Sequence, residues 1–125
     1  MLSDRRVYAT IPAADIARAK QWYEAKLGLK PRGEEPMGAI YELGAGTGFL
    51  LYPTSNAGMA PNTLATFSST DVPGDVSALR ARGVVFEEYD FPGLKTENGV
   101  AKLGDRQAAW FKDSEGNILA IGEGN

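Results

Sequence analysis

The sequence contains no histidine and no cysteine among its 125 residues. Without cysteine the chain can form neither a disulfide nor a thiolate nucleophile, and without histidine its acid–base groups are carboxylates, lysines and tyrosines. No apolar run approaches the roughly 20 residues that a membrane span needs. The basic residues near the N-terminus are not followed by the apolar region of a signal peptide. These absences predict a cytoplasmic protein that does not associate with a membrane.

The charge is also modest, with 13 Lys and Arg against 16 Asp and Glu and a net charge of −3. Nucleic acid is not expected as a partner, because phosphate binding needs a basic face. The glycine-rich segment 44–48 lacks the lysine and the following helix of a phosphate-binding loop. With 43% hydrophobic residues, the chain is long enough to form one domain with a core, and we expect a single domain over residues 1–125.

One pattern occurs twice along the chain. A β-rich segment precedes an aspartate that can cap a helix, then an amphipathic stretch, then a glycine that can end the helix. The two occurrences are the strand Val7–Pro12 with a helix between Asp15 and Gly28, and the strand Thr63–Ser68 with a helix between Asp71 and Gly83.

The remaining apolar runs predict more strands. The hairpins expected are Ala39–Leu43 with Gly48–Tyr52, and Ala108–Lys112 with Asn117–Ile121, and a single strand is expected over Val84–Tyr89. The Gly- and Pro-containing segment Asp90–Gly99 is expected to be a loop, which could be a lid or a simple connector.

The order β-α-β-β-β is thus given twice, over residues 1–56 and 57–125. This predicts an α+β fold in which two βαβββ modules in tandem form a curved mixed sheet with a concave face. Each helix covers one face of its sheet and leaves the other bare, so the concave face is the expected place for a ligand.

Two motifs carry a resemblance to a known family. The segment Ala109–Leu119 is close to an aromatic-x-Asp-Pro-Asp-Gly-Asn-apolar hairpin, with Ser114 where proline is usual. The segment Asp15–Leu29 is similar to a helix that reads Asp-Leu, then Phe-Tyr, then Leu-Gly-Leu. In these features the chain resembles the vicinal oxygen chelate superfamily, which has the glyoxalase/bleomycin-resistance fold, over nearly its whole length. The resemblance implies the fold more strongly than any activity.

The resemblance also implies where a metal would be held. The family's metal enzymes use a His early in each half and a Glu in the last strand of each half, and these positions fall here on Tyr8, Leu64, Ala120 and Leu51, or on Tyr52 one residue later. Leucine and alanine offer no lone pair, and tyrosine is a poor ligand unless it is deprotonated. We therefore expect no metal site and no cofactor, and no glyoxalase, epimerase, extradiol dioxygenase or fosfomycin-type activity.

Alternation along the strands predicts which side chains line the concave face. The expected ligand-binding residues are Tyr8, Thr10, Phe49, Leu51, Leu64, Thr66, Ala108, Trp110 and Ala120. This aromatic and apolar set with a few hydroxyls suits stacking on a flat or hydrophobic molecule. Core packing or contact with a partner chain is the alternative for the same residues, and no catalytic residue is identified.

Other conspicuous residues have structural interpretations. Trp22 and Tyr23 lie on the inner face of the first helix and are expected in the core. The acidic run Glu87–Asp90 is expected at a solvated strand end. Asp113 and Asn117 are residue types that favour turns.

Three functions remain open. The favoured one is a metal-free binder of a small molecule, similar to the family's bleomycin-binding proteins, which sequester antibiotics in grooves formed by a dimer. The second is an enzyme of the lyase, isomerase or dioxygenase type that works without the family metal. The third is a protein-interaction domain. The family's habit and the exposed concave face both predict a homodimer.

Overall fold

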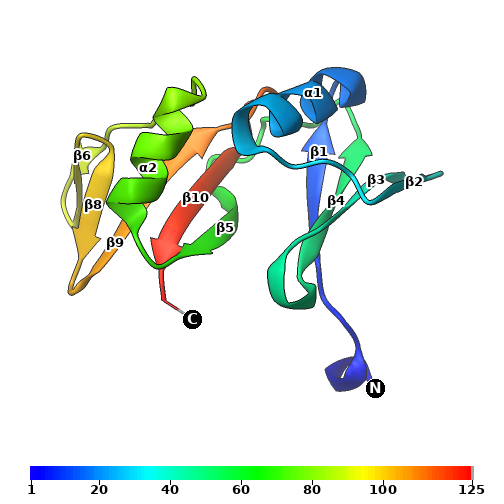
Figure 1. Cartoon of the computed structure of the whole chain (residues 1–125), viewed down its shortest axis with the longest axis horizontal. Helices are drawn as coiled ribbons and strands as arrows, with labels where there is room; N and C mark the ends of the chain where they lie inside the picture. The colour runs from blue at the N-terminus through cyan, green and yellow to red at the C-terminus, as the bar shows by residue number, and fades with distance from the viewer. Residues whose placement is uncertain (125) are drawn as a thin grey trace.

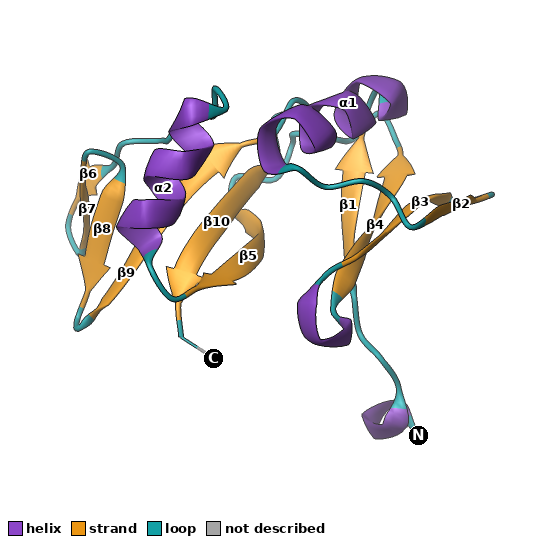
Figure 2. Cartoon of the chain, viewed as in Figure 1, coloured by secondary structure: helices purple, strands orange, loops and turns teal. Residues whose placement is uncertain are grey.

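The computed structural model describes residues 1–124 and contains two sheets, each accompanied by one α-helix (Figures 1 and 2). The first module comprises β1 (Ala9–Ala13), α1 (Ile16–Leu27), β2 (Gly33–Glu35), β3 (Gly38–Glu42) and β4 (Gly48–Pro53). Its strands are ordered β1-β4-β3-β2, with β1 parallel to β4 and the other neighbours antiparallel. Short 3-10 turns occupy Leu2–Asp4 and Gly44–Gly46.

The second module repeats this plan with more strands. It comprises β5 (Thr63–Ser69), α2 (Val72–Ala81), β6 (Asp90–Phe91), β7 (Leu94–Glu97), β8 (Val100–Leu103), β9 (Arg106–Lys112) and β10 (Ile118–Glu123). Its order is β5-β10-β9-β8-β7-β6, and its first and last strands are again parallel. The predicted α+β fold of two related modules is confirmed. Neither α-helix is long and apolar enough to cross a membrane.

The helix boundaries follow from the capping residues. The side chain of Asp15 accepts a hydrogen bond from the backbone N–H of Arg18, and that of Asp71 accepts one from Gly74. Gly28 ends α1 with φ +69°, a left-handed conformation that favours glycine. The second helix ends at Ala81, two residues before Gly83.

Two predictions in the second module are wrong. Over Val84–Tyr89 the backbone forms no strand and meets the sheet at an isolated bridge from Phe86 to Phe111 and at a hydrogen bond from the N–H of Thr96 to the carbonyl of Tyr89, because β8 occupies the remaining length of that edge of β9. The segment Asp90–Gly99 is not a loop but carries β6 and β7. Asn98 and Gly99 both have positive φ, which gives a tight reversal from β7 to β8.

The core lies between each helix and its sheet. In the first module Tyr23 of α1 is fully buried against the sheet, as predicted. Trp22, also predicted in the core, is only partly buried, but its ring stacks on Phe111 of the second module with 6.2 Å between centroids. Helix α1 therefore packs against both modules.

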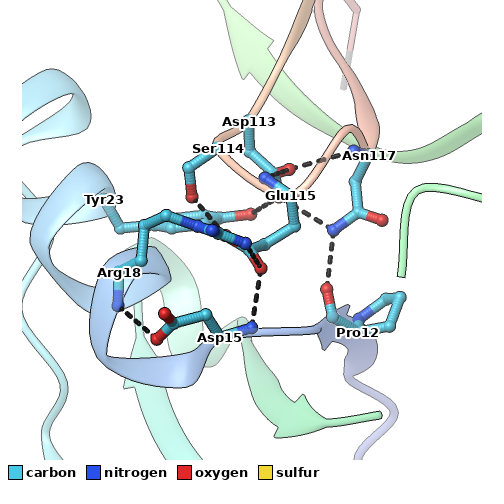
Figure 3. Close-up of polar contacts among 8 residues, drawn as sticks. All are labelled: Pro12, Asp15, Arg18, Tyr23, Asp113, Ser114, Glu115 and Asn117. Carbon is cyan, nitrogen blue, oxygen red and sulfur yellow. Dashed lines mark hydrogen bonds and ion pairs between the residues drawn. The ribbon is translucent and has the colours of Figure 1, made fainter. Parts of the chain in front are cut away.

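The turn Asp113–Asn117, between β9 and β10, fastens the second module to the first (Figure 3). Glu115 has no exposed side-chain surface, and its carboxylate accepts hydrogen bonds of 2.9 Å from Nε and Nη2 of Arg18 and from the backbone N–H of Asp15. The amide Nδ2 of Asn117 donates to the carbonyl of Pro12 at 2.7 Å.

Asp113 completes this contact from within the turn. Its Oδ2 accepts a 2.7 Å hydrogen bond from the hydroxyl of Tyr23, and its Oδ1 accepts from the backbone N–H groups of Glu115 and Asn117. Asp113 and Asn117 are thus turn formers, as expected, and they also bind the other module. Burial and the neighbouring Asp113 carboxylate raise the pKa of Tyr23, so its hydroxyl keeps the proton that it donates.

Tyr23→Phe is expected to destabilise the fold, because it removes a buried hydrogen bond to a carboxylate, by about 1.5–3 kcal/mol. Tyr41→Phe is the matched control, since the buried hydroxyl of Tyr41 has no hydrogen-bond partner within residues 1–124. Urea unfolding should show a lower free energy of unfolding for Tyr23→Phe and no loss for Tyr41→Phe. Equal losses in both variants would contradict this role for the Tyr23 hydroxyl.

The free energy of unfolding should also depend on pH, because Glu115 titrates in acid. Hydrogen bonds from Arg18 lower the pKa of Glu115 from 4.5 to about 2. The ionised carboxylate therefore stabilises the fold above pH 4.5, and this contribution disappears as the pH falls toward about 2. Glu115→Gln should reduce the free energy of unfolding at neutral pH and flatten its fall in acid, whereas Glu97→Gln, at an exposed position, should leave the urea-unfolding pH profile unchanged.

Candidate functional site

The predicted site residues of β4 face the core rather than the open side. Phe49 is only 5% exposed, and its ring centroid lies 5.5 Å from that of Tyr23 in α1. Leu51 is fully buried and pairs with Ile11, which is also fully buried. The expectation that Phe49 and Leu51 face the concave surface is therefore wrong by one residue. Alternation places their neighbour Leu50 on the opposite face of the strand, where it is 7% exposed.

Tyr8 and Thr10 are exposed on the open side of the first sheet. Tyr8 precedes β1 and borders a concavity of about 230 Å³. Arg6, Arg32 and Glu42 also border it, and Nε of Arg32 lies 2.8 Å from Oε2 of Glu42. This concavity is therefore charged, unlike the apolar surroundings expected for Tyr8.

The predicted residues of β9 and β10 lie on the face of the second sheet that α2 leaves open. Trp110 is opposite Ala120 in the register, and Ala108 lies two residues before Trp110 on the same face. The ring of Trp110 meets the edge of Tyr89 with 5.6 Å between centroids, and Phe91 adjoins Tyr89. This aromatic group lies on the second sheet, two strands in from the edge strand β5, whereas Tyr8 precedes the edge strand of the first.

A cleft of about 620 Å³ lies where the two modules meet. We call it the inter-module cleft. Its walls are Ala9 and Phe49 of the first sheet, the connection Leu43–Gly48 between β3 and β4, and the segment Leu64–Ser68 of β5. The predicted ligand residues Phe49, Leu64 and Thr66 are therefore brought together here.

The cleft has this position because β1 and β5 are edge strands of different sheets. They approach each other without pairing, so backbone N–H and C=O groups along one edge of each strand have no strand neighbour. The side chains that line the cleft are apolar or carry hydroxyl groups, and none is ionisable. Such a lining can bury an apolar surface and hydrogen-bond a polar substituent.

The connection Leu43–Gly48 is a part of this wall that the sequence did not identify. Its glycines predicted only a hairpin turn. Ala45 adopts φ 58°, and the hydroxyl of Thr47 donates to the carbonyl of Gly44 at 2.6 Å, so the segment is a defined turn. Its contribution to the cleft arises from the packing of the modules, which no local sequence signal reports.

The donor set does not fit the family's metal. Tyr8, Leu64 and Ala120 stand at three of the four ligand positions, and the fourth is Leu51 or Tyr52. None of these side chains is an imidazole or a carboxylate. Within residues 1–124, no group of three or more Asp and Glu side chains is placed to hold a metal ion.

The acidic run beside the aromatic group has structural partners. Oε1 of Glu88 accepts hydrogen bonds from the hydroxyl of Thr96 at 2.6 Å and from the backbone N–H of Gly99 at 3.0 Å. The bond from Thr96 is the largest cause of the lowered pKa of Glu88. Glu87 lies 3.7 Å from Nζ of Lys112. Glu88 thus fixes the turn before β8; Glu88 and Asp90 are exposed, whereas Glu87 is partly buried.

Several solved structures share this fold. UcmS2 superposes with a TM-score of 0.74 at 18% identity, covering 94% of this chain and 96% of that one. A glyoxalase/bleomycin resistance protein from Catenulispora acidiphila gives 0.66 at 22% identity, with 96% and 98% covered. TnmS3, described as an antibiotic binding protein from a Streptomyces species, gives 0.64 at 20% identity, with 97% and 98% covered. Comparison with curated proteins gave no match.

The sequence itself matches a family model over residues 5–121, nearly its whole length. The match spans both modules and includes the capped helix Ile16–Leu27 and the turn Asp113–Asn117. It agrees with the repeated strand–helix order and with the parallel pairing of the first and last strands in each sheet. The chain therefore belongs to the Glyoxalase/Bleomycin resistance protein/Dioxygenase superfamily.

Proposed function

We propose that this protein binds a small, largely apolar molecule in the inter-module cleft, that the part of the molecule in the cleft is uncharged, and that binding does not need the family's metal. The observation that carries the proposal is the lining of the cleft, which encloses about 620 Å³ without an ionisable side chain. A charged group placed in the cleft would lose its hydration without gaining an ion pair, so the part of the ligand that lies there is expected to be uncharged.

The contacts available in the cleft suit a flat molecule. Phe67 supplies aromatic surface from β5 and Leu64 adds aliphatic surface, while the largely buried Phe49 lies in the opposite wall. Each side chain of this size contributes about 1.5–3 kcal/mol when it is fully buried. The hydroxyls of Thr66 and Ser68 can bind a carbonyl or hydroxyl group of the ligand and fix its orientation.

The fold neighbours support the same class of function. TnmS3, which shares the fold over 97% of this chain, is described as an antibiotic binding protein. Polycyclic aromatic antibiotics have the flat, largely apolar surface that the cleft can cover. We propose sequestration of a compound of this kind as the role of the protein.

N-phenyl-1-naphthylamine, an uncharged aromatic fluorophore, is a suitable probe for the cleft. We expect its fluorescence to rise on binding, and Thr66→Trp, which fills the cleft from β5, to weaken its affinity at least about tenfold, or about 1.4 kcal/mol. Ser55→Trp, at an exposed turn position outside the cleft lining, is the matched control and should bind normally.

The same titration tests independence from metal. Addition of EDTA should leave the affinity unchanged, because no carboxylate or imidazole occupies the family's ligand positions. A loss of affinity with EDTA that Zn²⁺ restores would contradict metal-free binding. Equal affinities for wild type and Thr66→Trp would place the bound probe elsewhere.

We also propose that the protein is a homodimer that uses the open side of the first sheet. Val7 is 89%, Met37 is 71% and Tyr8 is 56% exposed, and Tyr8 and Met37 both border the concavity of the first sheet. Exposed apolar side chains gathered in this way are typical of an interface. Figure 1 shows the N-terminal segment, which holds Val7 and Tyr8, extending beyond the start of β1.

Sedimentation equilibrium tests the proposed dimer. The wild type should show about twice the chain mass of 13.4 kDa, and the double variant Val7→Lys with Tyr8→Glu should shift toward the monomer. Val85→Lys, at a residue that is 77% exposed in the second module, should leave the mass unchanged. A monomeric wild type would contradict the proposal.

A further inference from the structure

A second cavity lies on the helical side of the junction between the modules. It measures about 200 Å³ and is bounded by Leu27 at the end of α1, by Leu29 after that helix and by Leu79 of α2. Its floor includes the buried side chains of Phe111 and Ile121. We call it the helical cavity. An apolar group that entered it would contact the core of the second module directly.

The helical cavity adjoins the inter-module cleft. Leu43, Phe67 and Ser68 line both of them. Phe67 pairs with Ile121, so its side chain lies on the α2 side of β5, whereas Ser68 next to it points to the opposite side. The two spaces are therefore separated at the β5 edge by the residues that line both of them.

One charged side chain stands at this junction. Within the described residues 1–124, Asp75 in the first turn of α2 is the only ionisable residue that lines either the helical cavity or the inter-module cleft. Its Oδ2 accepts a 2.6 Å hydrogen bond from the hydroxyl of Ser69. Within residues 1–124, none of the ion pairs includes Asp75.

We propose that the ligand is an elongated apolar amine, whose apolar body lies in the inter-module cleft and passes Phe67 into the helical cavity, where its ammonium group meets Asp75. This proposal rests on the proposed function and specifies the class of ligand. The cleft has no ionisable side chain to receive the charge, so the charged group binds at the helical end, where Asp75 lacks a cation and the surrounding wall is apolar.

Octylamine and 1-octanol form a matched pair of probes, since they share an apolar chain and differ in the charged group at neutral pH. Isothermal titration should give octylamine the higher affinity in the wild type. Asp75→Asn should weaken octylamine binding about fivefold, the size expected for one exposed ion pair, and leave 1-octanol unchanged. Ala78→Trp, which fills the helical cavity from an exposed position of α2, should weaken both, and Ser77→Trp on the neighbouring position neither.

Competition with N-phenyl-1-naphthylamine separates this proposal from the proposed function. Displacement of the fluorophore by octylamine, with the Asp75 dependence above, supports an amine that spans both spaces. Equal affinities for the two probes, or an unchanged octylamine affinity in Asp75→Asn, would overturn it while cleft binding stands. Octylamine binding that depends on Asp75 but leaves the fluorophore bound would overturn the continuous path. A fluorophore that does not bind at all would overturn cleft binding itself.

Discussion

The arrangement of the two modules depends on one polar contact, the insertion of the turn Asp113–Asn117 against β1 and α1. A buried carboxylate is costly unless it is paired and hydrogen-bonded, and Glu115 is both, through Arg18 and the backbone of Asp15. Because these bonds are directional, they fix the position of the second sheet relative to the first more narrowly than apolar packing alone could. The proposed ligand site depends on that position, since neither module forms the inter-module cleft by itself.

The position of this contact also determines how the rest of the junction between the modules is arranged. The turn joins the two modules at the carboxyl end of β1, where Asn117 binds Pro12. Nearer the start of β1 the edge of that strand and the edge of β5 remain unpaired, and the cleft lies between them. Edge strands that stay apart carry backbone groups able to bind a ligand or another strand. The cleft is thus a consequence of joining the sheets at one end rather than along their length.

Short sequence patterns predicted the features that depend on interactions between residues close together in the chain. The caps at Asp15 and Asp71 and the left-handed Gly28 were recognisable because each satisfies backbone groups within a few residues. The face of the sheet to which each residue of β4 points was not recognisable, because a shift of one residue exchanges the two faces. As a result, Phe49 and Leu51 lie in the core and not on the expected surface. The ion pair of Arg18 with Glu115 joins residues 97 positions apart. The inter-module cleft, which depends on such contacts, has no signature in any short segment.

The candidate site therefore combines predicted and unpredicted parts. Leu64 and Thr66 lie in the wall of the inter-module cleft, while Trp110 belongs to a separate aromatic group on β9. The most direct measurement is an ¹⁵N NMR titration of the protein with N-phenyl-1-naphthylamine. Amide shift changes concentrated in Leu43–Phe49 and Leu64–Ser68 are the expected result. Changes concentrated around Trp110, with these two segments unaffected, would contradict ligand binding between the modules.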